Sequence, residues 1–252
     1  MNQQLYIISG SSRGMGEAMA LQLLAEGHYV LGLARGQSGA LSEAAQRGAG
    51  TLAQWSVDLS APLAAAQALQ DWLLALDPQR YASVSLINNA GVVTPPGPIE
   101  DVPLAQLSAA IRVGLEACLL LSSAFLRGTQ AWPGSKRLLN ISSGLGRRAM
   151  SGAAPYCGAK AGIDHLSRAL ALDEARKTLG AKVVSLAPGV IDTGMQVQLR
   201  AADPAQFPEQ ARFAELKAKG QLSSADDAAC LVLAYLRRAD FGVNVIADVR
   251  EA

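Results

Sequence analysis

Tyr156 and Lys160 lie four residues apart at the start of an alanine-rich segment, and their side chains could transfer protons. The segment predicts a helix over Ala154–Leu179, in which this spacing puts the phenol and the ammonium on one face, one turn apart. Free tyrosine has a pKa of about 10, so it exchanges protons at neutral pH only where its phenolate is favoured. A neighbouring ammonium favours the phenolate by Coulomb attraction. The pair therefore predicts an acid–base centre, with a chance surface pair as the alternative.

A serine precedes this pair, at the end of a predicted strand. Ser143 lies thirteen residues before Tyr156 and directly follows the strand Arg137–Ser142. From such a place a hydroxyl can hydrogen-bond a substrate carbonyl oxygen and hold it against the proton of the tyrosine. A Ser-Ser pair at a strand end is also ordinary turn chemistry. We expect Ser143 to orient the carbonyl that the tyrosine protonates.

A glycine-rich turn joins the first predicted strand, Leu5–Ser9, to the first predicted helix, Met15–Ala25. Its sequence has the spacing GxxxGxG: Gly10-Ser11-Ser12-Arg13-Gly14-Met15-Gly16. Glycines let the backbone turn tightly and approach a pyrophosphate, and the free N–H groups at a helix N-terminus attract the anion. The turn therefore predicts a dinucleotide phosphate site, and simple punctuation of the chain is the alternative.

The end of the second predicted strand, Tyr29–Ala34, indicates which nicotinamide dinucleotide would bind. An NAD site has an acidic side chain here, which accepts hydrogen bonds from the ribose 2′-hydroxyl. In this chain Arg35 follows the strand, and no carboxylate occurs before Glu43. Arg35, with Arg13 from the glycine turn, could clamp a 2′-phosphate through charge-assisted hydrogen bonds. We therefore expect NADP(H) as cofactor, unless both are solvated surface arginines.

Short apolar runs alternate with long Ala/Leu segments, a pattern typical of the βα repeats that build a parallel sheet. The predicted strands are Leu5–Ser9, Tyr29–Ala34, Leu52–Val57, Val84–Asn88, Arg137–Ser142, Val183–Ala187 and Val243–Ala247. The predicted helices are Met15–Ala25, Ser60–Ala75, Leu104–Arg127, Ala154–Leu179 and Ser224–Arg238. Right-handed crossovers make these an α/β fold, a Rossmann-type doubly wound parallel sheet of seven strands with helices on both faces. The ligand crevice of such a sheet lies at the carboxyl ends of its strands.

No linker or internal repeat divides the chain, so residues 1–252 are expected to form one domain. One long stretch, Pro188–Gly220, has weak apolar periodicity and carries Asp203-Pro204 and Phe207-Pro208, which predicts irregular structure. A long segment after a strand end is often a mobile cover for a site. We predict a substrate lid around residues 190–220, with an inert surface loop as the alternative.

The composition argues against several classes of partner. With 22 Lys plus Arg against 21 Asp plus Glu, the net charge of +1 gives no reason to expect nucleic acid or an anionic membrane. The N-terminal residues lack the pattern of a signal peptide, and no stretch approaches the roughly 18 apolar residues of a membrane span, so we expect a cytoplasmic protein. No metal site is expected either, because the metal-binding or disulfide-forming residues are few and scattered: Cys118, Cys157, Cys230, His28 and His165.

Further motifs stand in a fixed order along the chain: Asp58 after the third predicted strand, Asn88-Asn89-Ala90-Gly91 after the fourth, and Pro188-Gly189 followed by Thr193 after the sixth. Together with the glycine turn and the serine, tyrosine and lysine, this order resembles the short-chain dehydrogenase/reductase family over nearly the whole chain. The resemblance implies that Tyr156 is the general acid for carbonyl reduction. It also implies that Lys160 lowers the tyrosine pKa and binds the nicotinamide ribose, and that Ser143 orients the substrate.

The same resemblance implies a set of cofactor contacts. Asp58 is similar to the acid that contacts the adenine, Asn88 and Ala90 to residues beside the adenosine, and Thr193 to a contact of the nicotinamide amide. The full implied set is Gly10, Ser12, Arg13, Gly14, Met15, Gly16, Arg35, Asp58, Asn88, Ala90, Gly91, Tyr156, Lys160, Pro188, Gly189, Val190, Ile191 and Thr193.

One position departs from the family pattern. The family usually has an asparagine in its long fourth helix, where the main-chain carbonyl holds a water that relays protons to the lysine. Here that position is Gly114, in the run Arg112-Val113-Gly114-Leu115-Glu116. A glycine keeps the carbonyl and tolerates a local helix distortion, so the relay can survive while the side-chain hydrogen bonds are lost. We expect slower turnover or an altered relay.

Motifs in the second half narrow the resemblance to the sepiapterin reductase and benzil reductase branch of the family. They are Arg147-Arg148-Ala149-Met150-Ser151-Gly152, Tyr156-Cys157-Gly158-Ala159-Lys160, the run from Leu186 to Gln196, and Glu215-Leu216-Lys217-Ala218-Lys219-Gly220. The branch reduces one carbonyl of a vicinal dicarbonyl, which implies an NADPH-dependent carbonyl reductase. Gly144, Leu145, Ala149 and Met150 favour a mostly apolar pocket for a flat carbonyl compound.

The implied substrate contacts are Ser143, Tyr156, Met195 and Asp248. Asp248 resembles an acid near the C-terminus that anchors the pterin ring in sepiapterin reductases, and a solvated residue at the chain end is the equal alternative.

The long helices also carry more apolar surface than one sheet face requires, so we expect a homodimer with a small-molecule carbonyl substrate. Two other functions stay open. One is reduction of another carbonyl class, such as a 3-oxoacyl thioester, sugar or steroid, and the other is an inactive NADPH-binding sensor or scaffold.

Overall fold

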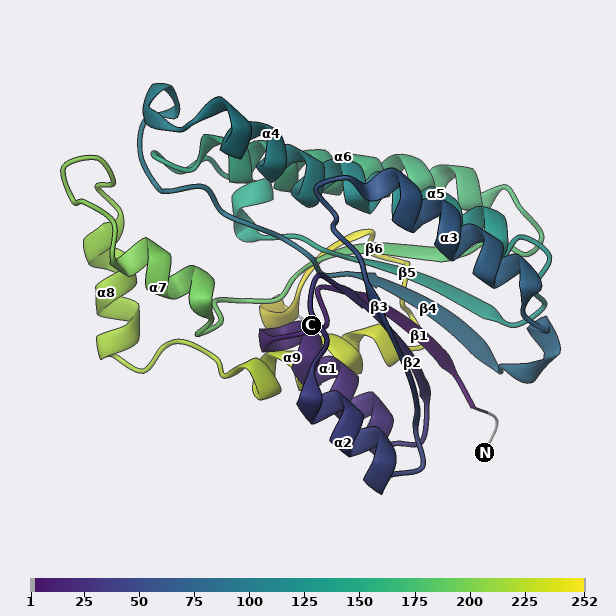
Figure 1. Ribbon diagram of the computed structural model, residues 1–252. Coiled ribbons are helices and arrows are strands. Elements are labelled where there is room, and N and C mark those ends of the chain that lie inside the picture. The colour runs from purple at the N-terminus through teal and green to yellow at the C-terminus, as the bar shows by residue number, and fades with distance from the viewer. Residues whose placement is uncertain (1–2, 252) are drawn as a thin grey trace.

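Seven strands form one parallel sheet in the computed structural model, which describes residues 3–251 (Figure 1). The strands are β1 (Leu5–Ser9), β2 (Tyr29–Ala34), β3 (Thr51–Ser56), β4 (Ser83–Asn88), β5 (Ser135–Ile141), β6 (Lys182–Ala187) and β7 (Ile246–Asp248). Their order across the sheet is β3-β2-β1-β4-β5-β6-β7. The strand order therefore reverses between β1 and β4, which is where doubly wound sheets bind their ligands.

Helices cover both faces of the sheet (Figure 1). They are α1 (Gly14–Ala25), α2 (Gly39–Arg47), α3 (Pro62–Ala75), α4 (Leu104–Ile111), α5 (Ala117–Gly128), α6 (Ala154–Ala175), α7 (Gly194–Arg200), α8 (Gln210–Ala218) and α9 (Ala225–Arg237). Successive strand residues point to opposite faces, so Tyr6 and Ile8 pack with α1 and α9, and Leu5 and Ile7 pack with α3 and α5. The predicted fold class is confirmed.

The predicted strands agree closely with the observed ones except at the C-terminal end. Six have bounds within two residues of those predicted, whereas the last was expected at Val243–Ala247 and forms at Ile246–Asp248. Val243 is 74% exposed and follows a turn in which Gly242 has φ of +93°. Val243 belongs to the loop before the strand. A β-branched residue in a loop and one in a strand look alike in the sequence.

Three short helices were not predicted. The stretch Pro188–Gly220 was expected to be irregular and contains α7 and α8. Their apolar side chains pack on a small cluster around Phe207 and Met150, away from the sheet, so they lack the long apolar stripe that marks a covering helix. Helix α2 was missed for a similar reason, because Leu41 is its one buried residue.

The expectation that no stretch approaches a membrane span was wrong by length and composition. The helical stretch Leu104–Gly128 is long and apolar enough, and 44% of its most apolar 18-residue window is buried. In the structure it lies beside α3 and α6 on one face of the sheet (Figure 1), as a covering helix does. A π-helical turn, Arg112–Glu116, separates its α4 and α5 parts.

Candidate active site

The glycine turn after β1 and the turn after β4 pack against each other at the carboxyl edge of the sheet. Asn89 Nδ2 donates hydrogen bonds to the carbonyl oxygens of Ser9 (3.0 Å) and Gly10 (3.1 Å). A Cβ on Gly10 would lie 3.0 Å from the Cα of Ala90. The sequence motif gave Asn89 no role of its own. The one feature that could have indicated it is a polar side chain directly after a buried strand. It fixes the two turns relative to each other.

The glycine turn has the backbone that its sequence predicts. Gly10 and Gly14 have φ of +71° and +59°, and a Cβ on Gly16 would lie 2.2 Å from the Gly10 carbonyl oxygen, which explains why glycine stands at each position. Helix α1 begins at Gly14, and no side chain caps it at the preceding residue, Arg13. The first-turn N–H groups are therefore left for another acceptor, and a dinucleotide pyrophosphate fits them. The Met15 side chain is buried in the core, so only its backbone can contact a cofactor.

The end of β2 presents exposed positive charge. Arg13 and Arg35 are exposed, and neither forms an ion pair within residues 3–251. The pKa of Asp58 is lowered, first by hydrogen bonds from Ser60, whose backbone N–H lies 2.9 Å from Oδ1, and last by the charge of Arg35. These groups fit the adenine and 2′-phosphate end of NADP(H).

Asn88 points into the protein rather than along the sheet edge. Its Nδ2 donates to Asn140 Oδ1 (2.9 Å) and to Ser122 Oγ (3.0 Å), which ties β4 to β5 and α5. Asn140 in turn donates to Ser167 Oγ on α6 at 2.9 Å. This buried network fixes the strand ends under the site, and nothing in its motif pointed to Asn140 or Ser122.

Ser143, Tyr156 and Lys160 lie together on this edge. Ser143 begins the turn after β5, where its Oγ accepts a hydrogen bond from the Leu145 N–H (3.1 Å). Tyr156 is in the first turn of α6, and Lys160 Nζ lies 5.6 Å from the centre of its ring. The ammonium donates to the Ile141 carbonyl oxygen at 2.7 Å. The structure thus brings together the three residues expected to be catalytic.

The electrostatics of the pair differ from the expectation. Burial lowers the pKa of Lys160 to about 8, against smaller raising effects of Cys118 and Asp164. Burial also raises the pKa of Tyr156, and a hydrogen bond with Ser143 opposes this. With its pKa at about 8, Lys160 is neutral at the higher pH at which the buried phenol titrates, so it gives the phenolate no Coulomb attraction there. The phenol is therefore protonated at neutral pH, as a proton donor must be.

Gly114 lies in the π-helical turn of the long helix, which confirms that this position is distorted. The N–H of Ala117 donates to the carbonyl of Arg112, five residues back. Gly114 is buried, and a Cβ there would lie 3.1 Å from the Cβ of Ala159 on α6. The glycine therefore allows close packing of the π-helical turn on the helix that carries Tyr156.

The segment after β6 borders the glycine turn. Gly189 has φ of +84°, and the carbonyl oxygen of Val190 accepts a hydrogen bond from the Ser223 N–H at 3.0 Å. Thr193 directly precedes α7, and its methyl carbon would lie 3.8 Å from a Cβ on Gly14. Ile191 packs against the core cluster that includes α1 and α9. The segment Pro188–Thr193 is thus in reach of a molecule bound at the glycine turn.

A small apolar cavity of about 30 Å³ adjoins Tyr156. Its lining comprises Val93, Thr94, Pro96, Leu145, Met150, Gly152, Ala153, Tyr156, Met195 and Leu199. This volume is far below the roughly 300–1,000 Å³ of typical ligand pockets, so an organic substrate needs α7 or the neighbouring loop to move. Met195, which was expected to contact the substrate, is one of the lining residues.

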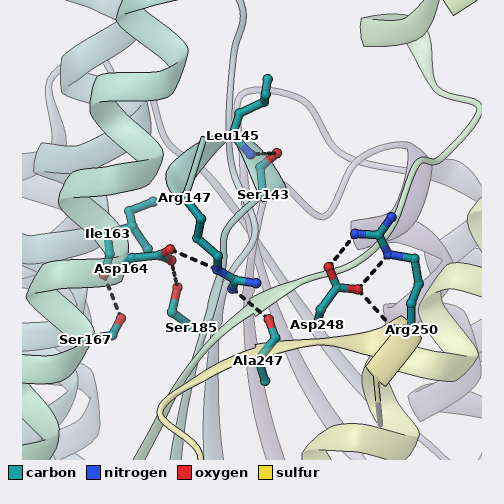
Figure 2. A network of polar contacts seen from close by, with 10 residues as sticks. All are labelled: Ser143, Leu145, Arg147, Ile163, Asp164, Ser167, Ser185, Ala247, Asp248 and Arg250. Carbon is teal, nitrogen blue, oxygen red and sulfur yellow. Dashed lines mark hydrogen bonds and ion pairs between the residues drawn. The ribbon is translucent and has the colours of Figure 1, made fainter. Parts of the chain in front are cut away.

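Asp248 does not line this cavity. It is buried in β7, where its two carboxylate oxygens accept from the Arg250 guanidinium at 2.8 and 2.5 Å (Figure 2). That ion pair holds the pKa of Asp248 below its usual range. The structure therefore places the predicted anchor residue in an ion pair at the sheet end, and not beside Tyr156.

Within residues 3–251 no group of three or more His, Cys, Asp or Glu side chains could hold a metal ion.

The fold and this constellation define an oxidoreductase built on a doubly wound sheet. The profile of the short chain dehydrogenase family matches residues 4–204. The chain is 34% identical to a benzil reductase ((S)-benzoin forming) of Bacillus cereus, covering 97% of this chain and 98% of that protein. It is 32% identical to sepiapterin reductase of Rattus norvegicus, covering 93% and 92%.

A solved structure with bound NADP, described as a 2-deoxy-d-gluconate 3-dehydrogenase of Agrobacterium tumefaciens, superposes with a TM-score of 0.80. It shares 25% identity, covering 99% of this chain and 95% of that one. The chain belongs to the short-chain dehydrogenase/reductase family.

Proposed function

We propose that the protein is an NADPH-dependent reductase of one carbonyl of a vicinal dicarbonyl, such as an aromatic diketone or a pterin side chain. The observation that carries the proposal is that Tyr156, which lies with Ser143 and Lys160, forms part of the wall of an apolar cavity. The relatives named benzil reductase and sepiapterin reductase support this substrate class, because they match over almost the whole chain. The apolar lining suits a flat substrate with few polar groups.

The cofactor contacts divide between the two ends of NADP(H). The uncapped N–H groups of α1 would hold the pyrophosphate, and Arg13 and Arg35 would hold the 2′-phosphate. Gly91 borders Lys160, with 3.8 Å between a Cβ built there and Nζ, which supports a nicotinamide end beside the turn after β4. When bound, NADPH supplies the hydride that reduces the carbonyl carbon.

The chain's own residues then handle the proton. Ser143 Oγ–H donates a hydrogen bond to the substrate carbonyl oxygen and polarises it. Tyr156 Oη gives its proton to the same oxygen as negative charge develops there. Lys160, as ammonium, stabilises the phenolate that this transfer leaves, and it is held for that role by the Ile141 carbonyl. The raised pKa of Tyr156 keeps the proton in place until then.

A panel of carbonyl compounds tests the proposed function. Purified protein is given NADPH and sepiapterin, benzil, 1-phenyl-1,2-propanedione or an acetoacetyl thioester, and loss of NADPH absorbance is followed. Turnover of the dicarbonyls above that of the thioester supports the proposal. Turnover of the thioester alone would move the protein to another carbonyl class, and binding of NADPH without reduction would favour a sensor.

We propose that α7 and α8, within residues 190–220, form the substrate lid, and Phe207 tests this. The ring of Phe207 is fully buried, stacks on Phe213 at 5.8 Å and abuts Gly152. Phe207→Ala should loosen the closed cover and raise the KM of the dicarbonyl about tenfold. A tenfold change in KM corresponds to ~1.4 kcal/mol. Replacing a buried phenylalanine by alanine typically costs about 3–5 kcal/mol of packing stability, which is more than enough.

The measurement is steady-state kinetics with NADPH saturating, and Val197→Ala on the exposed face of α7 is the matched control. Because Phe207 lies away from the glycine turn, NADPH affinity should stay at the wild-type value. An unchanged dicarbonyl KM in Phe207→Ala would show that α7 and α8 do not cover the substrate.

We also propose a homodimer, formed through the outer faces of the long helices. Large apolar side chains are exposed there: Leu104, Ile111 and Leu119 on α4 and α5, and Leu172 on α6, which is 72% exposed. Large apolar side chains exposed on neighbouring helices are typical of a protein interface. Sedimentation velocity at micromolar concentration should give a dimer, and Leu172→Glu should give a monomer. A monomeric wild-type protein contradicts the proposal.

A further inference from the structure

A buried carboxylate lies on the catalytic helix one turn beyond Lys160. Asp164 on α6 is 2% exposed (Figure 2). Ser185 Oγ on β6 donates to its Oδ1 at 2.6 Å, and Arg147 Nε donates to its Oδ2 at 3.3 Å. Burying a carboxylate is costly unless it is paired and hydrogen-bonded, so this charge needs the partners it has.

Arg147 comes from the segment that begins at Ser143. Its Nη2 also donates to the carbonyl oxygen of Ala247 on β7 at 2.7 Å, so one side chain joins three parts of the fold (Figure 2). The neighbouring Gly146 packs directly on α6, because a Cβ there would lie 2.9 Å from the Lys160 carbonyl oxygen and 3.0 Å from Asp164 Oδ2. The ion pair therefore holds the serine segment against the helix that carries the tyrosine and lysine.

The surroundings of Lys160 give Asp164 a second effect. The titratable groups that face the ammonium are Tyr156 and Asp164 on α6 and Cys118 on α5, while β5 contributes the neutral Ile141 carbonyl. Burial raises the pKa of the Cys118 thiol to about 12, so it is uncharged at neutral pH. Asp164 is then the negative charge that favours the ammonium, and Arg147 partly offsets it.

We propose that Asp164 and Arg147 are positioning residues that together set how much of Lys160 is ammonium and hold Ser143 against Tyr156. The proposal rests on the proposed reductase function. The charges of Asp164 and Arg147 have opposite effects on Lys160. The carboxylate attracts the ammonium directly, and the guanidinium weakens that attraction.

Two variants should therefore move the alkaline limb of activity in opposite directions. Asp164→Asn keeps an acceptor for Ser185 and removes the charge, so Lys160 loses its proton at lower pH and the limb shifts down by about one pH unit. Arg147→Met leaves the carboxylate unopposed, so the limb shifts up. A direct effect of Asp164 on Tyr156 is weaker, because eight residues of helix span about 12 Å and four span about 6 Å.

The experiment measures kcat/KM for a dicarbonyl from pH 6 to 10 (about the range of the Lys160 transition) in wild type and both variants. Arg147→Lys should restore the wild-type limb because it keeps the charge, and Arg148→Met, at the exposed neighbour, should leave it unchanged. If Asp164 and Arg147 only stabilise the fold, both variants should have a lower kcat and an alkaline limb at the same pH as the wild type. That result, or a shift of both limbs in the same direction, overturns the proposal.

NADPH binding gives a readout that does not need turnover. Because the ammonium is expected to hold the nicotinamide ribose, binding followed by fluorescence should weaken above the Lys160 pKa, and the two variants should move this midpoint in opposite directions. If wild type binds NADPH and reduces no carbonyl, the reductase proposal fails while this comparison still tests the positioning role. If turnover is present and the midpoints coincide, the positioning proposal alone fails.

Discussion

Tyr156→Phe should lower kcat for dicarbonyl reduction by about a thousandfold while NADPH still binds. The change removes the hydroxyl that donates the proton and keeps the ring that lines the cavity. Positioned general acids contribute about 10²–10⁴-fold, and here Ser143 and Lys160 remain but neither is placed to replace the lost proton. The measurement is single-turnover reduction, with NADPH affinity determined separately by fluorescence.

Ser143→Ala is the companion variant for this test. It keeps the proton donor and removes the neighbouring hydroxyl that lowers the pKa of the phenol, so a smaller loss is expected. Retention of more than about a tenth of the wild-type rate in Tyr156→Phe would mean that another group or a water protonates the alkoxide, since a general acid contributes at least about 10²-fold. Loss of NADPH binding in the same variant would mean instead that the phenol holds the cofactor.

Arg35→Asp should raise the KM for NADPH about a hundredfold and bring NADH to comparable efficiency. The change removes charge-assisted hydrogen bonds to the 2′-phosphate, typically about 1.5–3 kcal/mol each, and adds a repelling carboxylate. A total near 3 kcal/mol corresponds to about a hundredfold in affinity. The new acid also supplies the acceptor for a ribose 2′-hydroxyl that the end of β2 lacks.

The control is Arg80→Asp, which makes the same charge change before β4, at the opposite end of the sheet. It should alter neither KM, because a charge at that distance is screened by salt. An unchanged NADPH KM in Arg35→Asp would show that the guanidinium is solvated in the complex and that cofactor preference is set elsewhere.

The elements around β1 were predictable because their signals are local in the chain. Five buried residues, then a turn with glycines at Gly10, Gly14 and Gly16, then a helix, form a pattern that needs no distant partner. The same holds for α6, where Tyr156 and Lys160 share a face through helical geometry alone. Helix α2 shows the converse, since a helix with little buried apolar surface leaves little periodicity to detect.

The electrostatics of the site were not predictable in this way. From spacing, Lys160 was expected to lower the pKa of Tyr156, and in the folded chain burial raises it. The Ile141 carbonyl that accepts a hydrogen bond from the ammonium lies nineteen residues back in the sequence, on β5. Likewise the sequence left Asp248 equally open as a substrate anchor or a solvated residue at the chain end, and in the folded chain its carboxylate is buried and held by Arg250.

The amino-acid sequence by itself determined the parallel sheet, the order of the motifs along its carboxyl edge, and the membership of serine, tyrosine and lysine in one site. Tertiary structure decided how α7 and α8 pack on the cluster around Phe207 and Met150, the protonation states at the site, and the contacts of Arg147 with Asp164 and Ala247. The reason is physical. Periodicity and turn chemistry depend on neighbours within a few residues, whereas burial and charge at one atom depend on every group that folding brings beside it.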